Sequence, residues 1–251
     1  MPDRRDVIYL YDGSFEGLLS AVFECYANHD FPSAIEQTEY GQQTLFSDYL
    51  HIATDSSKAE RVAKKITEVS GSMALHEIYQ CYLSTLSGKG IHIFNYIRAC
   101  LKFGAEVDKH LTIDCVNAVI TASKAVGSEA HLYKEFIRFS ELENGVYYSK
   151  IEPKNDVLPL IAPHFTHRYS SMPFIIHDIV HWQCLVYNGR SCVIREAENM
   201  PVLRLSGAET EYRRLWKQFY DTIAIRERRN EKCRMTQMPK RFWRCMTEFQ
   251  Q

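Results

Sequence analysis

The chain has 251 residues and a formal net charge of −1, with 45% hydrophobic and 24% charged side chains. Such a chain can bury the core of one large domain or of two small ones. It has no run of about 18 apolar residues and no cleavable apolar leader, which excludes a membrane-spanning helix and a signal peptide, so we expect a cytoplasmic protein without a membrane partner.

The first predicted unit is a strand over residues 7–11, a turn at Asp12-Gly13, and a helix whose N-cap is Ser14 or Asp12. Backbone amides at the start of a helix can receive a phosphate, which makes Gly13 and Ser14 candidate phosphate-binding residues. The alternative is that these residues only turn and cap the chain, since no complete GxGxxG or Walker pattern is present.

A second apolar run begins at Tyr49 and precedes Asp55 and a helical pattern, so the strand-then-helix order repeats and predicts parallel pairing. Residues 73–102 and 114–136 have helical spacing. Because no linker composition interrupts the chain, we predict one α+β domain over residues 1–251. A weak subdivision would separate a βα and helical part, 1–136, from a part with hairpins and basic helices, 137–251.

After Phe136 the pattern changes to alternation, with a turn at residues 143–145 and two strands joined by Asn188-Gly189. Asn-Gly between alternating runs is a strong hairpin signal, and a two-residue loop fixes the register. The predicted pairs are Leu185 with Cys192, Cys184 with Val193, and His181 with Glu196.

The cysteines and histidines do not predict a metal or cofactor site. Eight cysteines without a CxxC pair exclude the usual zinc-ribbon and redox spacings, and we expect reduced thiols. Histidines 164, 167, 177 and 181 could supply ligands, but 177 and 181 lie four residues apart on a predicted strand, about 13 Å. Structural roles are favoured, with His164 and His167 in a turn and His181 beside Glu196.

The C-terminal part is basic and amphipathic. Residues 206–251 carry eleven Lys or Arg against six Asp or Glu, whereas the preceding 205 residues carry 19 against 25. Ser206 and Glu209 have capping-box spacing, and Pro239 can start a second helix. We expect both helices to pack on the body. The predicted buried side chains are Tyr212, Leu215, Trp216, Phe219 and Ile223 of the first helix and Phe242, Met246 and Phe249 of the second.

The segment from 226 to 244 has eight basic and two acidic residues. Arginine binds phosphate through two-point contacts and aromatic rings can stack on bases, so this surface suits nucleic acid. The same cations could instead pair with the acidic part of the chain. The predicted nucleic-acid-binding residues are Arg226, Arg228, Arg229, Lys232, Arg234, Lys240, Arg241 and Trp243.

Four stretches occur in a fixed order: YDGSFEGLLSAVFECY, EFIRFSELENGVYYSKIEP, IAPHFTHRYSSMPFIIHD and LWKQFYDTIAIRERRNEKCRMTQMPKRFW. With them the chain resembles, over nearly its whole length, a family of bacterial DNA-metabolism proteins, a domain of unknown function. Members are typically encoded beside a radical-SAM protein of DNA modification or repair, and some are fused ahead of a uracil-DNA glycosylase-like domain. The resemblance implies such partners in trans and assigns no catalytic residue.

These observations lead to one hypothesis and two alternatives. We expect an accessory protein of DNA repair or modification that binds DNA through its basic C-terminal segment and acts with a radical-SAM partner, which would carry the iron–sulfur chemistry because no CxxxCxxC triad is present. The first alternative is an enzyme acting on a nucleotide or nucleic acid near Asp12 and the histidine-bearing strands. Convergence of His131, His164 and His177 with Asp12 in one cleft would favour the enzyme, and their dispersal would favour the accessory role. The second is a protein-binding subunit without DNA affinity.

Overall fold

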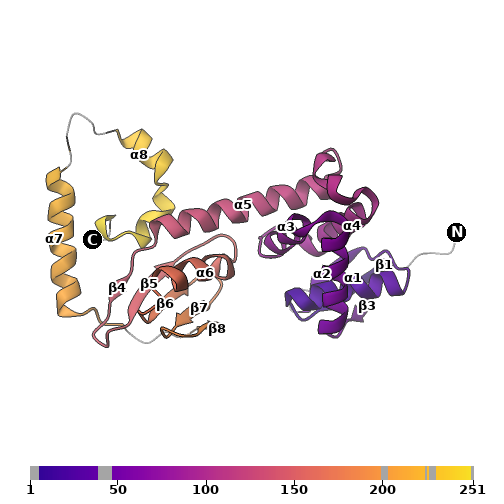
Figure 1. Cartoon of the computed structure of the whole chain (residues 1–251), viewed down its shortest axis with the longest axis horizontal. Coiled ribbons are helices and arrows are strands. Elements are labelled where there is room, and N and C mark those ends of the chain that lie inside the picture. Colours follow the sequence, from indigo (N-terminus) through magenta and orange to yellow (C-terminus); the bar gives the residue numbers. More distant parts are fainter. Residues whose placement is uncertain (1–5, 39–46, 199–202, 224, 226–229, 250–251) are drawn as a thin grey trace. The chain divides into compact units, whose positions relative to one another are not determined.

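The computed structural model describes residues 6–38, 47–198, 203–223, 225 and 230–249. The chain has an α+β fold, as predicted, and divides into two compact units, Met1–Val126 and Gly127–Gln251 (Figure 1). The boundary between the units falls inside the long helix α5, Asp114–Phe136. The subdivision inferred from the sequence was placed at the end of that helix.

The first unit is built on a parallel sheet with the strand order β2-β1-β3. The strands are β1 Asp6–Tyr11, β2 Ala34–Gln37 and β3 Ser47–His51. In the central strand, Tyr9 lies opposite Ile35 on one side and Leu50 on the other. This confirms the parallel pairing predicted from the repeated strand-then-helix order.

Helices supply the rest of the first unit. They are α1 Phe15–Ala27, α2 Ser56–Ser70, α3 Ser72–Tyr82, α4 Lys89–Phe103 and the 3-10 helix η1 Gly104–Lys109. The helix-rich middle of the chain is therefore confirmed. The core joins Tyr9 of the sheet to Leu18 and Val22 of α1, Ile78 of α3 and Ile97 of α4, all of them almost completely buried.

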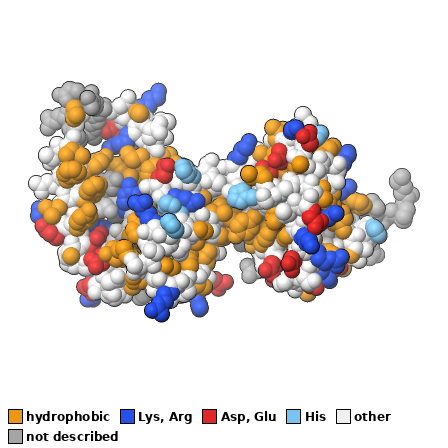
Figure 2. All heavy atoms as spheres, viewed as in Figure 1, with side chains coloured by type: hydrophobic (Ala, Val, Ile, Leu, Met, Phe, Trp, Pro, Cys, Tyr) orange, Lys and Arg blue, Asp and Glu red, His pale blue; other side chains and the backbone are white. Residues whose placement is uncertain are grey.

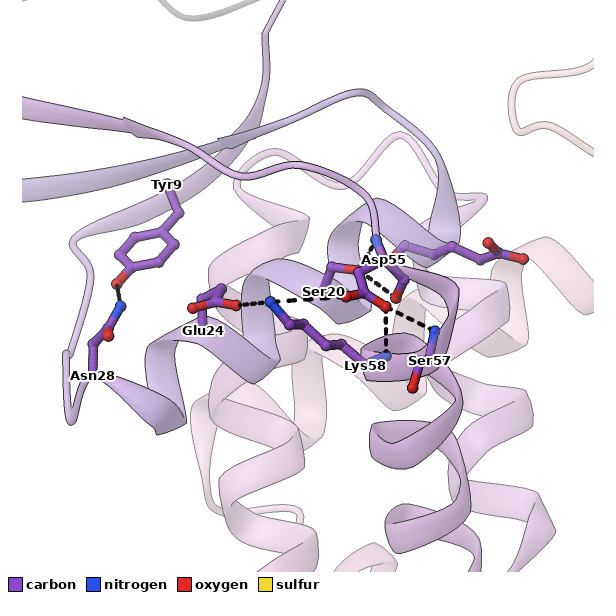
Figure 3. Close-up of polar contacts among 8 residues, drawn as sticks. Tyr9, Ser20, Glu24, Asn28, Asp55, Ser57 and Lys58 are labelled. Carbon is purple, nitrogen blue, oxygen red and sulfur yellow. Dashed lines mark hydrogen bonds and ion pairs between the residues drawn. The ribbon is translucent and has the colours of Figure 1, made fainter.

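A polar cluster fixes α2 against α1 (Figure 3). Asp55 caps α2 by accepting hydrogen bonds from the backbone N–H groups of Ser57 and Lys58. The hydroxyl of Ser20, on α1, donates to the Asp55 carbonyl at 3.1 Å and accepts from the Asp55 N–H at 3.0 Å. Lys58 reaches back to Glu24 at 2.6 Å. The start of α2 is thus held by the helix that precedes it in the chain.

The second unit contains a mixed sheet with the order β4-β5-β6-β7-β8. Its strands are β4 Ser140–Glu141, β5 Tyr147–Ile151, β6 Phe174–Asp178, β7 Gln183–Tyr187 and β8 Cys192–Glu196. The parallel pair β5 and β6 is connected through α6, Leu158–Arg168. Phe165 of α6 contacts Phe174 of β6, so α6 covers the sheet face that also carries Ile176 and Leu185.

The predicted hairpin register is wrong by two residues. Leu185 lies opposite Ile194, Cys184 opposite Arg195, and Gln183, in place of His181, opposite Glu196. The reason is the side chain of Asn188, whose Oδ1 accepts hydrogen bonds from the N–H groups of Arg190 and Ser191 and closes a four-residue loop.

The residues predicted as the first strand of that hairpin form two strands, β6 and β7, instead of one. Residues 179–182 form a turn between β6 and β7, with Trp182 at φ 56°. His181 therefore lies in a turn next to Asp178 and not on a strand, which corrects its pairing with Glu196. His164 and His167, expected in a turn, lie on α6.

The C-terminal part forms α7 Gly207–Ile223, α8 Glu231–Gln237, and the 3-10 helices η3 Lys240–Cys245 and η4 Thr247–Phe249. Ser206 caps α7 by accepting from the Glu209 N–H at 3.0 Å, as predicted. Phe242 and Met246 are 0% and 1% exposed, so the prediction that η3 and its neighbours close a core is confirmed.

The expected burial of the α7 stripe is wrong. Tyr212 is 61% exposed and Phe219 is 53% exposed, and Leu215 and Ile223 are exposed as well. The helix is attached near its two ends, through Arg213 hydrogen bonded to Ser140 and through Tyr220 in ring contact with Phe249. Residues Glu209, Tyr212 and Trp216 of α7 form one wall of a cavity.

All eight cysteines lie within the described residues and are free, in agreement with the predicted thiols. Cys184 and Cys192 point to opposite faces, because Cys192 is paired with Tyr187, three residues from Cys184. Within the described parts of the chain, no helix combines the length and the apolar character needed to span a bilayer.

Candidate functional site

The second unit contains a cavity of about 700 Å³. It lies where the C-terminal end of α5, the helix α6, the beginnings of β5 and β6, and the inner side of α7 come together. This volume is in the range of sites that bind small molecules. The charged and aromatic side chains that line it are Lys134, Glu135, Arg138, Phe139, Tyr147, His164, Phe165, Arg168, Tyr169, Phe174, Glu209, Tyr212 and Trp216.

Cations are concentrated on the side of the cavity formed by α5 and α6. Lys134 lies in the last turn of α5, Arg138 follows two residues after the end of that helix, and Arg168 is the last residue of α6. None of the ion pairs between described side chains involves these three cations. Figure 2 shows Lys, Arg and His side chains gathered on the visible face of this unit. An anion would therefore find uncompensated positive charge here.

His164 lies one helical turn before Arg168, and its pKa responds to the positive charges around it. Its pKa is lowered from the ordinary value, first because burial disfavours the charged ring and then because Lys134, Arg168 and His167 repel a proton on it. At neutral pH the imidazole is uncharged, so it can donate a hydrogen bond through one nitrogen and accept through the other. A bound anion would counteract this repulsion.

Aromatic rings line the cavity beside these cations. Phe139 contacts Phe165, Tyr169 and Phe174 at centroid distances of 5.2–5.5 Å, which gives a rigid floor. Trp216 projects from α7 and contacts Phe219 at 5.8 Å. The cavity thus combines cations with flat apolar surfaces, a combination that suits a ligand with an anionic group and a planar ring.

Two carboxylates also line the cavity, and both are already paired. Glu135 lies 3.1 Å from Nε2 of His131, one turn earlier on α5. Glu209 lies 2.8 Å from Nε of Arg213, one turn later on α7. Among the described side chains, neither carboxylate forms an ion pair with Lys134, Arg138 or Arg168.

The nucleic-acid-binding residues predicted from the sequence have different surroundings. Lys232 and Lys240 are exposed. Arg234 is ion-paired with Glu231, and Arg241 lies 3.4 Å from Glu129. Arg226, Arg228 and Arg229 lie outside the described residues. Some of these cations are thus used within the chain, as the alternative of pairing with acidic residues supposed, while the two lysines are presented to solvent.

Trp243, the aromatic member of the predicted set, is held on several sides. Its indole N–H donates to the Met238 carbonyl at 2.9 Å, and its ring stacks on Phe249 at 4.5 Å. Arg234 and Lys240 lie over the same ring at 4.9 and 5.8 Å. The ring is half-buried, so stacking on a base stays a prediction that would require Lys240 or Arg234 to move.

The candidate phosphate-binding residues Gly13 and Ser14 lie at the start of α1. Ser14 is the N-cap, and its hydroxyl accepts from the Gly17 N–H at 2.9 Å and donates to Asp12 at 2.6 Å. The Asp12 carboxylate also accepts from Thr54 at 2.7 Å, and these hydrogen bonds lower its pKa. The local contacts are those of a turn and cap centred on a carboxylate, and phosphate binding here stays a prediction.

Two of the histidines named for an enzymatic site lie at the cavity or beside a residue that lines it, and the third lies elsewhere in the second unit. His164 lines the cavity, His131 is paired with Glu135, and His177 lies 2.9 Å from the Tyr148 hydroxyl. His177 is on the face of β6 opposite to Phe174, whereas α6 covers the Phe174 face. Asp12 belongs to the first unit. Among described residues, no group of His, Cys, Asp and Glu could hold a metal ion.

The cavity residues were missed in the sequence. The available signal was the i, i+4 spacing of His164 with Arg168, which places them on one face of α6, and the basic residues Lys134 and Arg138 around the end of α5. Nothing in the spacing indicated that these two pairs would meet, because the helices are separated by two strands. Spatial neighbours of distant segments follow only from the fold.

The profile of one protein family matches residues 87–248, more than half of the chain, and the family is described as a domain of unknown function, DUF4130. No curated protein and no solved structure matched the chain. The matched segment contains the whole cavity and the C-terminal helices.

Proposed function

Because the chain belongs to the DUF4130 family, a domain of unknown function, the site must indicate the activity, and we propose that the protein binds nucleic acid as an accessory factor of DNA repair or modification. The observation that carries this proposal is the cationic and aromatic cavity of the second unit, with Lys134 and Arg168 beside His164 and without a carboxylate partner among the described side chains. Phosphates supply the matching charge and bases supply the matching rings.

The basic C-terminal segment extends this surface in the proposal. Lys232 and Lys240 are exposed, and η4, which follows them, contributes Thr247 to the cavity lining. Arg241 also has a structural role, because it lies next to the carboxylate of Glu129, whose side chain is 3% exposed. The lysines are thus proposed as phosphate contacts, whereas Arg241 stabilises the fold and binds DNA only secondarily.

The partner in this proposal comes from the sequence resemblance. That resemblance implies a gene neighbour that encodes a radical-SAM protein of DNA modification or repair, and a uracil-DNA glycosylase-like domain as a further associate. We propose that this chain presents DNA to such a radical-SAM protein, with a glycosylase-like protein as a further partner. Co-purification with the product of the neighbouring gene, with and without DNA, tests this part.

A second candidate function is an enzyme acting on a nucleotide or nucleic acid, and His164 favours it because a neutral imidazole at a cationic cavity can transfer a proton. The place of His177, on the sheet face opposite to the one that α6 covers, counts against the form of this hypothesis in which all the histidines meet in one cleft. A third candidate, a protein-binding subunit, predicts no DNA affinity at all.

The central experiment is fluorescence anisotropy with labelled single-stranded and duplex oligonucleotides at several salt concentrations. Binding through phosphates should weaken linearly in log affinity against log salt, with a slope of about −0.9 for each duplex phosphate neutralised. The double variant Lys232→Ala/Lys240→Ala should lower affinity and flatten the slope by roughly one unit for each lysine that binds a phosphate in the wild type. Its melting temperature should not change, because both lysines are exposed.

Two further variants serve as controls. Lys64→Ala/Lys65→Ala removes two exposed lysines of α2, in the first unit, and should leave DNA affinity unchanged. Arg241→Ala should lower the melting temperature, because it leaves the buried Glu129 without its cation. A wild-type protein without measurable affinity for either oligonucleotide at about 50 mM salt would defeat direct DNA binding and favour the protein-binding subunit.

A further inference from the structure

The cavity is too small for a nucleic-acid helix but large enough for one nucleotide. Its volume of about 700 Å³ is bounded by residues of α5, α6 and α7 together with residues of two strands. A base that is paired and stacked inside a duplex cannot reach such a space, whereas a base at a single-stranded position, or one rotated out of the helix, can. Size alone therefore selects an unstacked nucleotide over a duplex segment.

The distribution of charge assigns one end of this space to a phosphate. Lys134 and Arg168 lie close enough to His164 to repel its proton, and the two cations take part in no ion pair between described side chains. The guanidinium of Arg168 lies 5.9 Å from the Tyr169 ring, so it sits at the rim and is exposed. An arginine and a lysine in this position can share one phosphate group.

The rings that line the cavity, with Trp216 on the α7 wall, offer a surface to a base. Phe139 and Tyr169 are fixed by edge contact with each other, and Trp216 comes from α7, whose apolar side is otherwise exposed. An exposed apolar face is costly unless it has a partner. A flat ring inserted between Trp216 and the aromatic floor would give this part of the helix its partner and add stacking energy.

We propose that the cavity holds one unstacked nucleotide, with its phosphate on Lys134 and Arg168 and its base against Trp216. This inference rests on the proposed function, because DNA is the source of the nucleotide, and it narrows that function to recognition of single-stranded or extruded positions. A free nucleoside monophosphate carries the same chemistry and would occupy the same site.

The test begins with isothermal titration calorimetry of thymidine 5′-monophosphate, thymidine and inorganic phosphate on the full chain. Thymidine 5′-monophosphate should bind saturably and about tenfold or more tightly than either fragment, since only it reaches both the cations and the rings of the cavity. Arg168→Ala should weaken it about tenfold. Lys150→Ala, which removes an exposed cation from the opposite face of the same sheet, should not change the affinity.

Tryptophan fluorescence locates the base. The chain has three tryptophans, at positions 182, 216 and 243. Thymidine 5′-monophosphate should quench the emission of the wild type and of Trp182→Phe and Trp243→Phe, and the quenching should disappear in Trp216→Phe. Inorganic phosphate that binds as tightly as the nucleotide, with no change in emission, would replace the nucleotide site by a simple anion site and overturn the proposal.

Oligonucleotides separate this proposal from the function on which it rests. Trp216→Ala and Arg168→Ala should abolish the preference for a single strand, or for a duplex with a mismatched pair, over a perfect duplex. If oligonucleotides bind equally well to the wild type and both variants and the mononucleotide does not bind, the nucleotide site is refuted and DNA binding stands. If the mononucleotide binds and no oligonucleotide does at low salt, the site stands and its ligand is the free nucleotide.

Discussion

Gly90 lies in the first turn of α4, where the helix passes directly over β2. A side chain at this position would place its Cβ 2.1 Å from the backbone carbonyl oxygen of Ile35, and a carbonyl in a paired strand cannot move aside. We predict that Gly90→Ala destabilises the protein by roughly 1–3 kcal/mol. Gly207→Ala is the matched control, since it also adds one methyl group at the start of a helix and meets nothing within 4 Å. Equal melting temperatures for the two variants would contradict this packing.

His181 is a second residue whose surroundings make a prediction. The hydrogen bond from its Nδ1 to the buried Asp178, at 2.7 Å, raises its pKa, burial of the ring opposes this, and the charges of Asp178, Asp156 and Glu129 raise it further. Because the folded-state pKa is above the ordinary value of 6.5, the charged ring stabilises the fold fully below pH 6.5, and this stabilisation is lost as pH rises through the folded pKa.

The expected result is a pH-dependent difference between the wild type and His181→Gln. The wild type should exceed the variant in melting temperature most at about pH 6, and the excess should shrink toward about pH 9. Denaturation at several pH values measures it. Asp178→Asn should show the same loss, because it removes the carboxylate that holds the proton. A difference that does not vary with pH would mean that His181 contributes only packing.

At the scale of elements, the C-terminal part divides into one segment that completes a core and one that does not. Phe242 of η3 is 0% exposed and contacts Tyr133 and Phe136 of α5 at 4.9 and 5.4 Å. Phe219 of α7 is 53% exposed. We predict that Phe242→Ala costs about 3–5 kcal/mol of unfolding free energy, while Phe219→Ala, the same substitution, costs less than about 0.5 kcal/mol.

Chemical denaturation of the two variants checks this difference. A large loss in Phe219→Ala would mean that the exposed face of α7 is covered in solution. The comparison also explains the effect expected of removing every residue after Leu205. Such a truncation destabilises the fold because it removes Phe242, Cys245 and Met246 from the second core, and not because α7 itself is buried.

The elements that the sequence predicts well are those determined by neighbouring residues. Ser14 and Ser206 were predicted as helix caps and are confirmed, because a cap is a contact across two or three residues. The predicted register of the hairpin was wrong, because the side chain of Asn188, and not the Asn-Gly backbone, sets the loop length. The predicted burial of the α7 stripe was wrong, because amphipathic spacing indicates that a helix has an apolar face. It does not indicate whether another part of the chain covers that face.

The candidate site shows the same limit. Arginine and lysine content near the C-terminus pointed to residues 226–244, a local feature of composition. The cavity instead depends on Lys134 and Arg168, which lie 34 positions apart and meet only because α6 returns across the sheet to the end of α5. No periodicity records such a meeting, so this part of the site could not be predicted without the fold.

The whole molecule has two hydrophobic cores, one formed by residues from Tyr9 to Ala122 and the other by residues from Ala130 to Met246. All three tryptophans belong to the second unit, so their fluorescence reports on that unit alone. We predict that Ile78→Ala, in the first core, lowers the circular-dichroism midpoint and leaves the tryptophan midpoint unchanged. Phe242→Ala should lower the tryptophan midpoint. If both variants shift both midpoints equally, the chain unfolds as one cooperative unit.

The position of η3 also sets an order of events during synthesis. The first core is complete once residue 122 has left the ribosome, and the first unit can then fold while translation continues. The second core requires Phe242, Cys245 and Met246, which are among the last residues of the segment to be made. Until they emerge, the apolar rings of Tyr133 and Phe136 stay exposed to solvent. A stalled or shortened chain would therefore have a folded first unit joined to an incompletely folded second unit, whose exposed apolar surface chaperones and proteases recognise.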